Sequence, residues 1–199
     1  MYRSLVLNIT GLAGTGKSST VERLSVGSQE IAVFRPSDVL RKYAGEHAIT
    51  LSSREDYQNT RDMIIAGNPR VLIDPVLELA QIHPLVLVDG MRVYEDALAI
   101  QKELDSTSKV YKTAILVCPD TVRAQRILRD SDRQYRDTAR LTTQQEILAD
   151  EQADLNGSYN FAGVLNMHDL TAEPINTACY TIDEVAAQIT LAMRPYIRI

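Results

Sequence analysis

Short runs of aliphatic residues alternate along this chain with longer amphipathic stretches. A strand inside a parallel sheet is covered on both faces, so its sequence is continuously apolar. Such runs predict strands at Leu5–Thr10, Ile31–Phe34, Leu85–Val88, Thr113–Cys118 and, as a weaker fifth run, Ala162–Asn166. The alternation is typical of βαβ units, so we expect an α/β fold with a five-stranded parallel sheet between layers of helices.

The amphipathic stretches predict the helices. They cover Ser18–Ser25, Asp38–Ala44, Tyr94–Leu104, Thr121–Arg129, Thr143–Asn156 and Ile182–Met193. Thr143 and Glu146 have the spacing of a capping box, and the acids that follow Thr181 suit the positive end of a helix. The segment Leu170–Tyr180 has no readable pattern.

Two stretches are longer than a βα connection requires. Residues 35–83 carry helical patterns at Asp56–Ala66 and Asp74–Ile82, and residues 129–141 are dense in Arg and Asp. The sheet does not need either stretch for its stability, so we interpret them as flaps that close over a substrate. The 199 residues are expected to form a single domain.

A glycine-rich loop lies between the first strand and the first helix. Its sequence, Gly11-Leu12-Ala13-Gly14-Thr15-Gly16-Lys17-Ser18, matches the phosphate-loop pattern GxxxxGK[ST] at every fixed position. The glycines let the backbone N–H groups point at phosphate oxygens, and the helix adds the positive end of its dipole. Lys17 would reach the β- and γ-phosphates, and Ser18 would bind Mg²⁺. A glycine turn with an incidental Lys-Ser is the alternative, which the strand–loop–helix order disfavours.

We therefore expect a nucleotide such as ATP, together with Mg²⁺, at this loop. The residues expected to bind the nucleotide are Gly11, Ala13, Gly14, Thr15, Gly16, Lys17, Ser18 and Ser19.

Composition narrows the choice of partners. The net charge is −5 and the pI is near 5.2, which argues against binding of nucleic-acid polymers but leaves room for a local basic cleft. No apolar run is long enough to span a membrane, and the first strand begins too early to leave room for a signal peptide. Cys118 and Cys179 are expected to be reduced thiols. We expect a cytoplasmic protein, a monomer or homodimer, that acts on small molecules.

Two further groups of residues fall on the same rim of the expected sheet. Asp89 ends the third strand, where an acid near a phosphate loop can hold Mg²⁺, and Arg92 follows it. Ser37, Asp38 and Arg41 follow the second strand, with Asp38 and Arg41 on one helix face. The alternatives are a loop-capping Asp89, a surface Arg92, and a helix cap with a salt bridge at Asp38 and Arg41.

The last candidate group is a series of arginines. Its members are Arg123, Arg126, Arg129, Arg133, Arg136 and Arg140. Phosphoryl transfer needs positive charge around the transferring group, so two or three of them are expected to act, although the neighbouring aspartates also suit a solvated salt-bridged face. Tyr43 and Tyr57 are interpreted as packing residues in preference to an acceptor pocket.

These motifs, in this order, resemble the nucleoside monophosphate kinase group of P-loop proteins, which includes adenylate kinase and dephospho-CoA kinase. The segment Ser37–Arg41 is similar to the group's T-G-D-x-L-R motif, and Asp89–Arg92 is similar to D-G-x-P-R. The resemblance implies that Arg41 and Arg92 bind the acceptor's phosphate and that Asp89 serves Mg²⁺. It implies that Arg126 stacks on the adenine and that Arg129 and Arg133 bind phosphates. It also makes residues 35–83 an acceptor-binding insertion and residues 129–141 a LID.

The chain departs from this group at two motifs. Ser37 replaces a glycine, and the Asp89–Arg92 motif is one residue shorter. The resemblance implies an ATP-dependent kinase with a small phosphorylated acceptor, a nucleoside monophosphate, with Lys17, Asp38, Arg92, Arg129 and Arg133 as its catalytic residues. Two alternatives stay open. One is transfer to a hydroxyl, as in dephospho-CoA kinase, with Asp38 as the base. The other is a nucleotide-gated regulatory ATPase.

Overall fold

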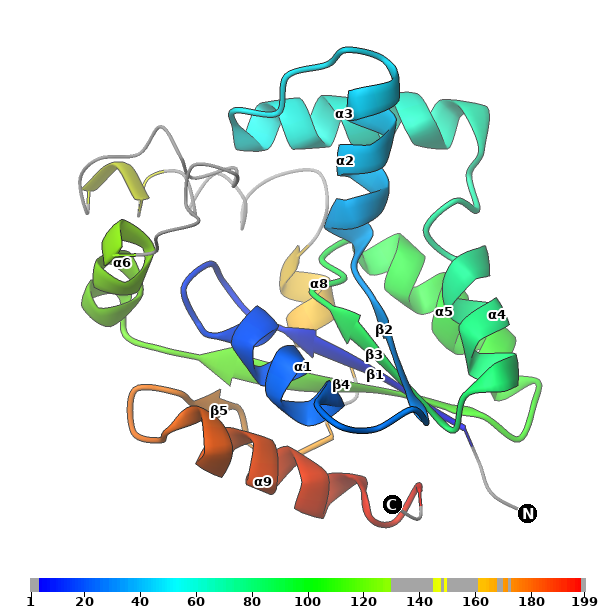
Figure 1. Cartoon of the computed structure of the whole chain (residues 1–199), viewed down its shortest axis with the longest axis vertical. Helices are drawn as coiled ribbons and strands as arrows, with labels where there is room; N and C mark the ends of the chain where they lie inside the picture. The colour runs from blue at the N-terminus through cyan, green and yellow to red at the C-terminus, as the bar shows by residue number, and fades with distance from the viewer. Residues whose placement is uncertain are drawn as a thin grey trace.

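The centre of the molecule is a five-stranded sheet in which all neighbouring strands are parallel (Figure 1). A computed structural model describes residues 4–129, 145–147, 149, 161–167, 170–171 and 173–197. The strand order is β2-β3-β1-β4-β5. The strands are β1 (Leu5–Thr10), β2 (Ile31–Phe34), β3 (Leu85–Asp89), β4 (Val110–Val117) and β5 (Ile175–Asn176). The α/β fold with a five-stranded parallel sheet is therefore confirmed.

Helices cover both faces of this sheet. They are α1 (Lys17–Ser25), α2 (Pro36–Glu46), α3 (Arg54–Gly67), α4 (Asp74–Ile82), α5 (Tyr94–Asp105), α6 (Asp120–Arg129), α8 (Phe161–Leu165) and α9 (Ile182–Met193). Side chains alternate along β1, so that Leu5 and Leu7 pack in one apolar cluster with α1 and α9, and Val6 packs in another with α4, α5 and α8. These two buried layers hold the sheet in place through the hydrophobic effect.

The predicted fifth strand is wrong. Residues 161–165 form helix α8, and Val164 is fully buried in the cluster that contains α4 and α5. A short apolar run has the same composition in a buried strand and in a buried helix, so periodicity could not separate the two. The fifth strand is instead Ile175–Asn176, which pairs with Leu116 and Val117 of β4. It lies in the segment that had no readable pattern.

The start of α2 also differs from the expectation. The helix begins at Pro36, because proline is favoured in the first turn of a helix, where its missing N–H costs nothing. Asp38 therefore lies inside the first turn, and Arg35 takes the N-cap position. Of the predicted helix Thr143–Asn156, residues 145–147 and 149 are helical. The rest of that helix, and residues 130–141 of the expected LID, lie outside the described residues.

The long stretch 35–83 divides into two parts. Figure 1 shows α2 and α3 standing beyond one edge of the sheet, whereas α4 lies alongside α5 and against the sheet. Ser53 caps α3 with Asp56 in a capping box, which fixes where this helix begins. Among the described helices, none combines the length and the apolar character that a membrane crossing requires.

Candidate nucleotide-binding site

The glycine-rich loop joins β1 to α1 at the carboxyl edge of the sheet. Its interior is held by the Thr15 hydroxyl, which donates to the Leu12 carbonyl at 2.8 Å, and by the Lys17 ammonium, which donates to the same carbonyl at 2.9 Å. The first turn of α1 supplies hydroxyls and a positive charge, from Lys17, Ser18, Ser19 and Thr20. Together with the helix dipole, this turn is suited to bind an anion.

Two glycines of the loop are required by their surroundings. Gly11 has φ +148° and Gly14 has φ +75°, a region that L side chains rarely adopt. A β-carbon at Gly11 would lie 2.2 Å from the Leu116 carbonyl oxygen, and one at Gly14 would lie 2.7 Å from the Arg123 carbonyl oxygen. The loop is therefore packed against β4 and α6 through its backbone, which fixes the direction of its N–H groups.

Asp89 lies beside this loop at the end of β3. It is paired in register with Ile9 of β1, and its side chain is only 7% exposed. Gly90 follows, and a β-carbon there would lie 3.5 Å from Cε of Lys17, so the lysine side chain passes close to this turn. The carboxylate of Asp89 thus belongs to the same small region as Lys17 and the phosphate loop.

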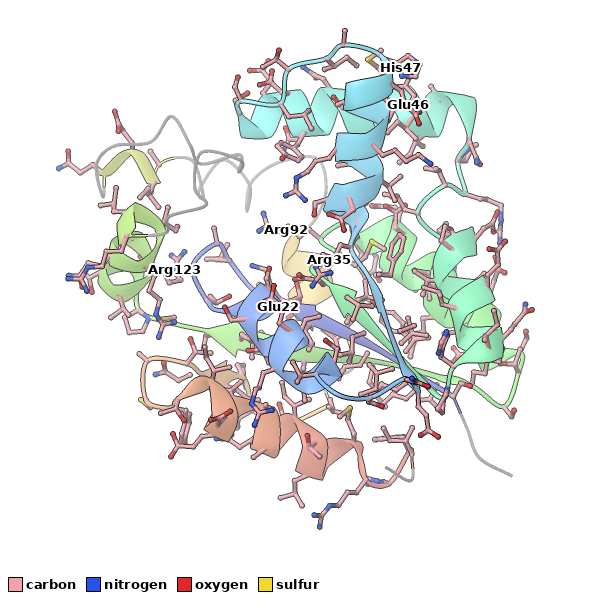
Figure 2. The ribbon with its side chains drawn as sticks, viewed as in Figure 1. Glu22, Arg35, Glu46, His47, Arg92 and Arg123 are labelled. Atoms are coloured by element: carbon pink, nitrogen blue, oxygen red, sulfur yellow. The ribbon has the colours of Figure 1, made fainter. Side chains whose placement is uncertain are left out.

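Sequence reasoning missed the cation that accompanies Asp89. Arg35 Nε lies 3.4 Å from Asp89 Oδ2, and Arg35 Nη2 lies 3.9 Å from Glu22 Oε1 of α1. In Figure 2, Arg35, Glu22 and Arg92 lie together in the space between α1 and α2. No motif includes Arg35, and its position at the junction of β2 and α2 was the only available signal.

A buried asparagine in β1 fixes the segment that carries Arg92. The Asn8 amide donates to the Met91 carbonyl at 3.1 Å and accepts from the Met91 N–H at 3.0 Å. Asn8 is fully buried, so these two bonds satisfy groups that have no contact with water. They set the path of the chain on both sides of Met91, and therefore the point from which Arg92 extends.

The arginines of α6 contact the phosphate loop through its carbonyl groups. Arg123 is 2% exposed, and its guanidinium donates to Ala13 O at 3.1 Å, to Cys118 O at 3.2 Å and to Asp120 Oδ1 at 2.6 Å (Figure 2). Arg126 donates to Gly14 O at 3.4 Å and to Thr177 O at 2.8 Å, so it joins the loop to the segment after β5. Arg123 therefore stabilises the contact between α6 and the phosphate loop. The sequence pattern could not distinguish such a buried arginine from one on the surface.

The residues expected to bind the acceptor lie on α2 and after β3. Arg41 donates to Asp38 Oδ1 at 2.8 Å and to the Ser37 hydroxyl at 3.2 Å, so the three form one cluster on a face of α2. The Asp38 side chain is 60% exposed. The alternative of a salt bridge between Asp38 and Arg41 is therefore present in the structure. Arg41 also lines the cavity described below.

A second charge pair, absent from our sequence-based candidates, joins α3 to α5. Arg61 Nη2 lies 2.8 Å from Asp96 Oδ2, and the two side chains are 14% and 8% exposed. Asp96 is in the first turn of α5, four residues after Arg92. The two residues of the pair are 35 positions apart, and nothing in the local pattern links them.

All of these elements surround one cavity of about 810 Å³. Of the predicted site residues, it is lined by Ala13, Gly14, Thr15, Gly16, Lys17, Ser18, Ser19, Ser37, Arg41, Asp89, Arg92, Arg126 and Arg129. Gly11 and Asp38 are not among its lining residues, and Arg133 lies outside the described residues. Arg61 and Asp96 line it as well, and so does Tyr57, which we had interpreted as a packing residue.

The donor atoms beside the phosphate loop fit a magnesium ion. Mg²⁺ prefers oxygen ligands and is usually held by one or two protein groups together with substrate phosphates. Ser18 supplies a hydroxyl and Asp89 a carboxylate, and both line the cavity. Asp89 is little exposed, and its carboxylate lies 3.4 Å from the Arg35 guanidinium.

No protein-family model matches this sequence, and no curated protein matches it significantly. Solved structures do match. A shikimate kinase from Bacteroides thetaiotaomicron is 12% identical, with 96% of this chain and 98% of that chain covered and a TM-score of 0.61. A tunicamycin resistance protein from Deinococcus radiodurans is 20% identical, with 95% of each chain covered and a TM-score of 0.53.

The chain has a P-loop kinase-like fold. At these identities the likeness concerns the fold, and function must be argued from the site. The phosphate loop, the acid at the end of the neighbouring strand and the outer helices of this fold all border the cavity described above.

Proposed function

We propose that this protein is an ATP-dependent kinase that transfers the γ-phosphoryl group to a small phosphorylated acceptor, a nucleoside monophosphate. One observation carries the proposal. The phosphate loop and a second group of cationic side chains, Arg41 and Arg92, line the same cavity from different elements. A protein that only bound or hydrolysed a nucleotide would have no need for this second group.

The cavity suits a transfer between two bound molecules. Its volume of about 810 Å³ lies in the upper part of the range for small-molecule sites. Lys17 and the N-terminal turn of α1 would hold the donor's phosphates, and Arg41 and Arg92 would hold the acceptor's phosphate. Holding two reactants in line supplies much of the acceleration in phosphoryl transfer, because the protein has little covalent chemistry to perform.

In the proposed reaction an oxygen of the acceptor's phosphate attacks the γ-phosphorus of ATP. A new P–O bond forms, the bond from the γ-phosphorus to the β–γ bridging oxygen breaks, and ADP leaves with that oxygen. A bound Mg²⁺ would neutralise charge on the donor phosphates. Lys17 would stabilise the charge that develops on the transferring group, and the arginines would keep the acceptor oxygen aligned.

The surroundings of Asp38 favour a phosphate acceptor over a hydroxyl acceptor. The hydroxyl alternative assigns Asp38 as the base, but its carboxylate pairs with Arg41 on an exposed surface and does not line the cavity. A phosphate monoester is largely ionised at neutral pH, so its oxygen can attack without a base. Arg41 and Arg92, which line the acceptor side of the cavity, also suit an anionic acceptor.

The test is a panel of acceptors incubated with γ-labelled ATP and Mg²⁺. The panel holds the common nucleoside monophosphates, dephospho-CoA and shikimate, with water as the blank. We expect label to appear in a nucleoside diphosphate, and we expect Lys17→Ala to abolish that product. Labelled product from dephospho-CoA or shikimate alone would replace the phosphate acceptor by a hydroxyl. Slow release of inorganic phosphate, unchanged by any acceptor, would favour a regulatory ATPase and contradict a kinase.

A further inference from the structure

The Arg61–Asp96 pair occupies an unusual position for two charged side chains. Both are largely withdrawn from water, yet both line the cavity, and they come from different helices, α3 and α5. The nitrogen–oxygen distance of 2.8 Å is that of a charge-assisted hydrogen bond. The pair is thus a fixed part of the cavity wall.

Stability alone gives little reason for such a pair. Removing two charges from water costs more than their attraction returns in many proteins, and apolar residues of similar volume often serve as well. A surface cluster formed by Arg70, before α4, with Asp74 of α4 and Glu103 of α5 shows the contrast. Arg70 contacts Asp74 at 2.7 Å and Glu103 at 2.6 Å, but these side chains are 42% to 47% exposed and lie away from the cavity.

The chemistry of the pair differs from that of Arg41 and Arg92. The Asp96 carboxylate is nearly buried and lines the cavity beside Arg61, so it would repel a phosphate group there, whereas the Asp38 carboxylate beside Arg41 is 60% exposed and does not line the cavity. The Arg61–Asp96 pair presents donors next to acceptors in a fixed arrangement, which matches a flat edge that also carries a donor next to an acceptor. Every nucleobase has such an edge, with an N–H or amino group beside a ring nitrogen or a carbonyl.

The rest of this part of the wall suits the faces of a ring. Leu72, Met91 and Val93 are buried apolar residues that line the cavity, and Tyr57 adds an aromatic side chain. Apolar and aromatic groups with a few placed polar ones are typical of sites for flat organic ligands.

We propose that the Arg61–Asp96 pair reads the edge of the acceptor's base, so that the acceptor must be a nucleotide and not merely a phosphorylated sugar. The inference rests on the proposed function, because it takes the arginines after β3 and on α2 as the phosphate contacts. Arg61 donates to the base and Asp96 accepts from it. Each residue also holds the other in place.

Calorimetry on the full chain tests the proposal in two steps. A non-hydrolysable ATP analogue with Mg²⁺ is titrated first, and failure to bind would count against the proposed function. AMP, GMP, CMP, UMP and ribose 5-phosphate are then titrated, with the analogue present if it binds and without it otherwise. We expect at least one nucleotide to bind roughly tenfold or more tightly than ribose 5-phosphate, which has the same phosphate and no base.

The variants Arg61→Lys and Asp96→Asn locate the source of that preference. Each should raise the Kd of the preferred nucleotide by roughly tenfold to a hundredfold, because a buried partner is left unsatisfied, and change that of ribose 5-phosphate by less than about twofold. Arg70→Lys, in the surface cluster, should change neither. Thermal melting shows whether each variant is folded.

Four outcomes would overturn the proposal. The wild-type protein could bind ribose 5-phosphate as tightly as every nucleotide, or fail to bind any of the five compounds. Both pair variants could leave the nucleotide's Kd unchanged. They could also weaken ribose 5-phosphate and the nucleotide equally, which would make Arg61 a phosphate contact.

Discussion

The two sides of the cavity are built in different ways. On the side of the phosphate loop, the wall is the loop itself and Lys17, and the loop is fixed by glycines and by contacts to β4 and α6. On the side of α2 and α3, the wall has long charged side chains, on helices that stand beyond the sheet (Figure 1). The first side is set by the path of the backbone, and the second by the choice of side chains.

This difference indicates which part of such a protein can change its specificity for the acceptor. A loop that reads phosphates through its backbone tolerates few substitutions, because each one alters the fold as well as the site. Side chains on outer helices can be exchanged at small cost to the core, since surface substitutions usually have small effects. We therefore expect damage on the donor side to remove all activity, and damage on the acceptor side to change which molecules are used.

The largest expected effect is that of Lys17→Ala. Removing the ammonium that we propose to bind the donor phosphates should lower kcat/KM by roughly a thousandfold or more, because charge stabilisation dominates phosphoryl transfer. Lys17 donates to the Leu12 carbonyl within the loop, so some loss of loop order is expected, but the melting temperature should change little. Steady-state kinetics with the best acceptor and a thermal melt measure the two quantities. Activity within tenfold of the wild type would contradict the donor role of this side.

Gly14→Ala should damage the fold and the site together. A β-carbon at φ +75° is strained, and it would lie 2.7 Å from the Arg123 carbonyl oxygen, so we expect a loss of about 2–4 kcal/mol in the free energy of unfolding. Urea denaturation and ATP binding measure the effect. Gly45→Ala in α2 is the matched control, because a β-carbon there meets nothing within 4 Å. It should leave stability unchanged or raise it by up to about 1 kcal/mol. Equal losses in the free energy of unfolding for the two variants would contradict the view that only the phosphate-loop side is fixed by its backbone.

Arg92→Gln should separate the two sides most clearly. The variant removes a charge from the acceptor side and leaves a shorter, neutral side chain that can still donate hydrogen bonds. We expect the KM for the acceptor to rise by roughly tenfold to a hundredfold, while the KM for ATP stays within about twofold. Both constants come from one two-substrate kinetic series. A larger rise in the KM for ATP than in the KM for the acceptor would indicate that Arg92 binds the donor instead.

The sequence anticipated the donor side better than the acceptor side, for a physical reason. The phosphate loop is a local structure, in which glycines at fixed spacing and an adjacent strand and helix decide the backbone path. Asp89 was also found, because it ends a strand that was recognised. Arg61 and Asp96 meet only because α3 and α5 pack as they do, and Arg35 meets Asp89 only because β2 lies next to β3. Such contacts between distant residues leave no local pattern.

The same reasoning explains the errors in the fold. The run at residues 161–165 is apolar in either structure, and the burial of Val164 in the core, which the sequence cannot report, accompanies the helix. The strand Ile175–Asn176 has only two residues, too few to show a period. Arg123 looked like its neighbours on α6, yet the packing of that helix on the phosphate loop buries it.

The smallest expected effect lies in the cap of α3, on the acceptor side. The Ser52 N–H, together with hydrogen bonds from the Ser53 and Ser52 side chains, lowers the pKa of Asp56 from 3.8 to about 2. A carboxyl group with a lowered pKa stabilises the folded state above its unfolded pKa, and that stabilisation is lost as the pH falls from about 3.8 through about 2. Asp56→Asn should therefore lower the melting temperature near neutral pH, by no more than a few degrees because the group is exposed to solvent, and the gap to the wild type should close in acid. Melting curves between pH 7 and pH 2 measure this gap.

The matched variant on the sheet side is Glu184→Gln, in the corresponding capping box of α9. Its melting temperature should change in the same direction, because the Thr181 N–H lowers the pKa of Glu184 as well. Only Asp56→Asn should also weaken acceptor binding slightly, since α3 carries Arg61 into the cavity. A gap that stays constant down to pH 2, or an equal effect of both variants on acceptor binding, would contradict this account of α3.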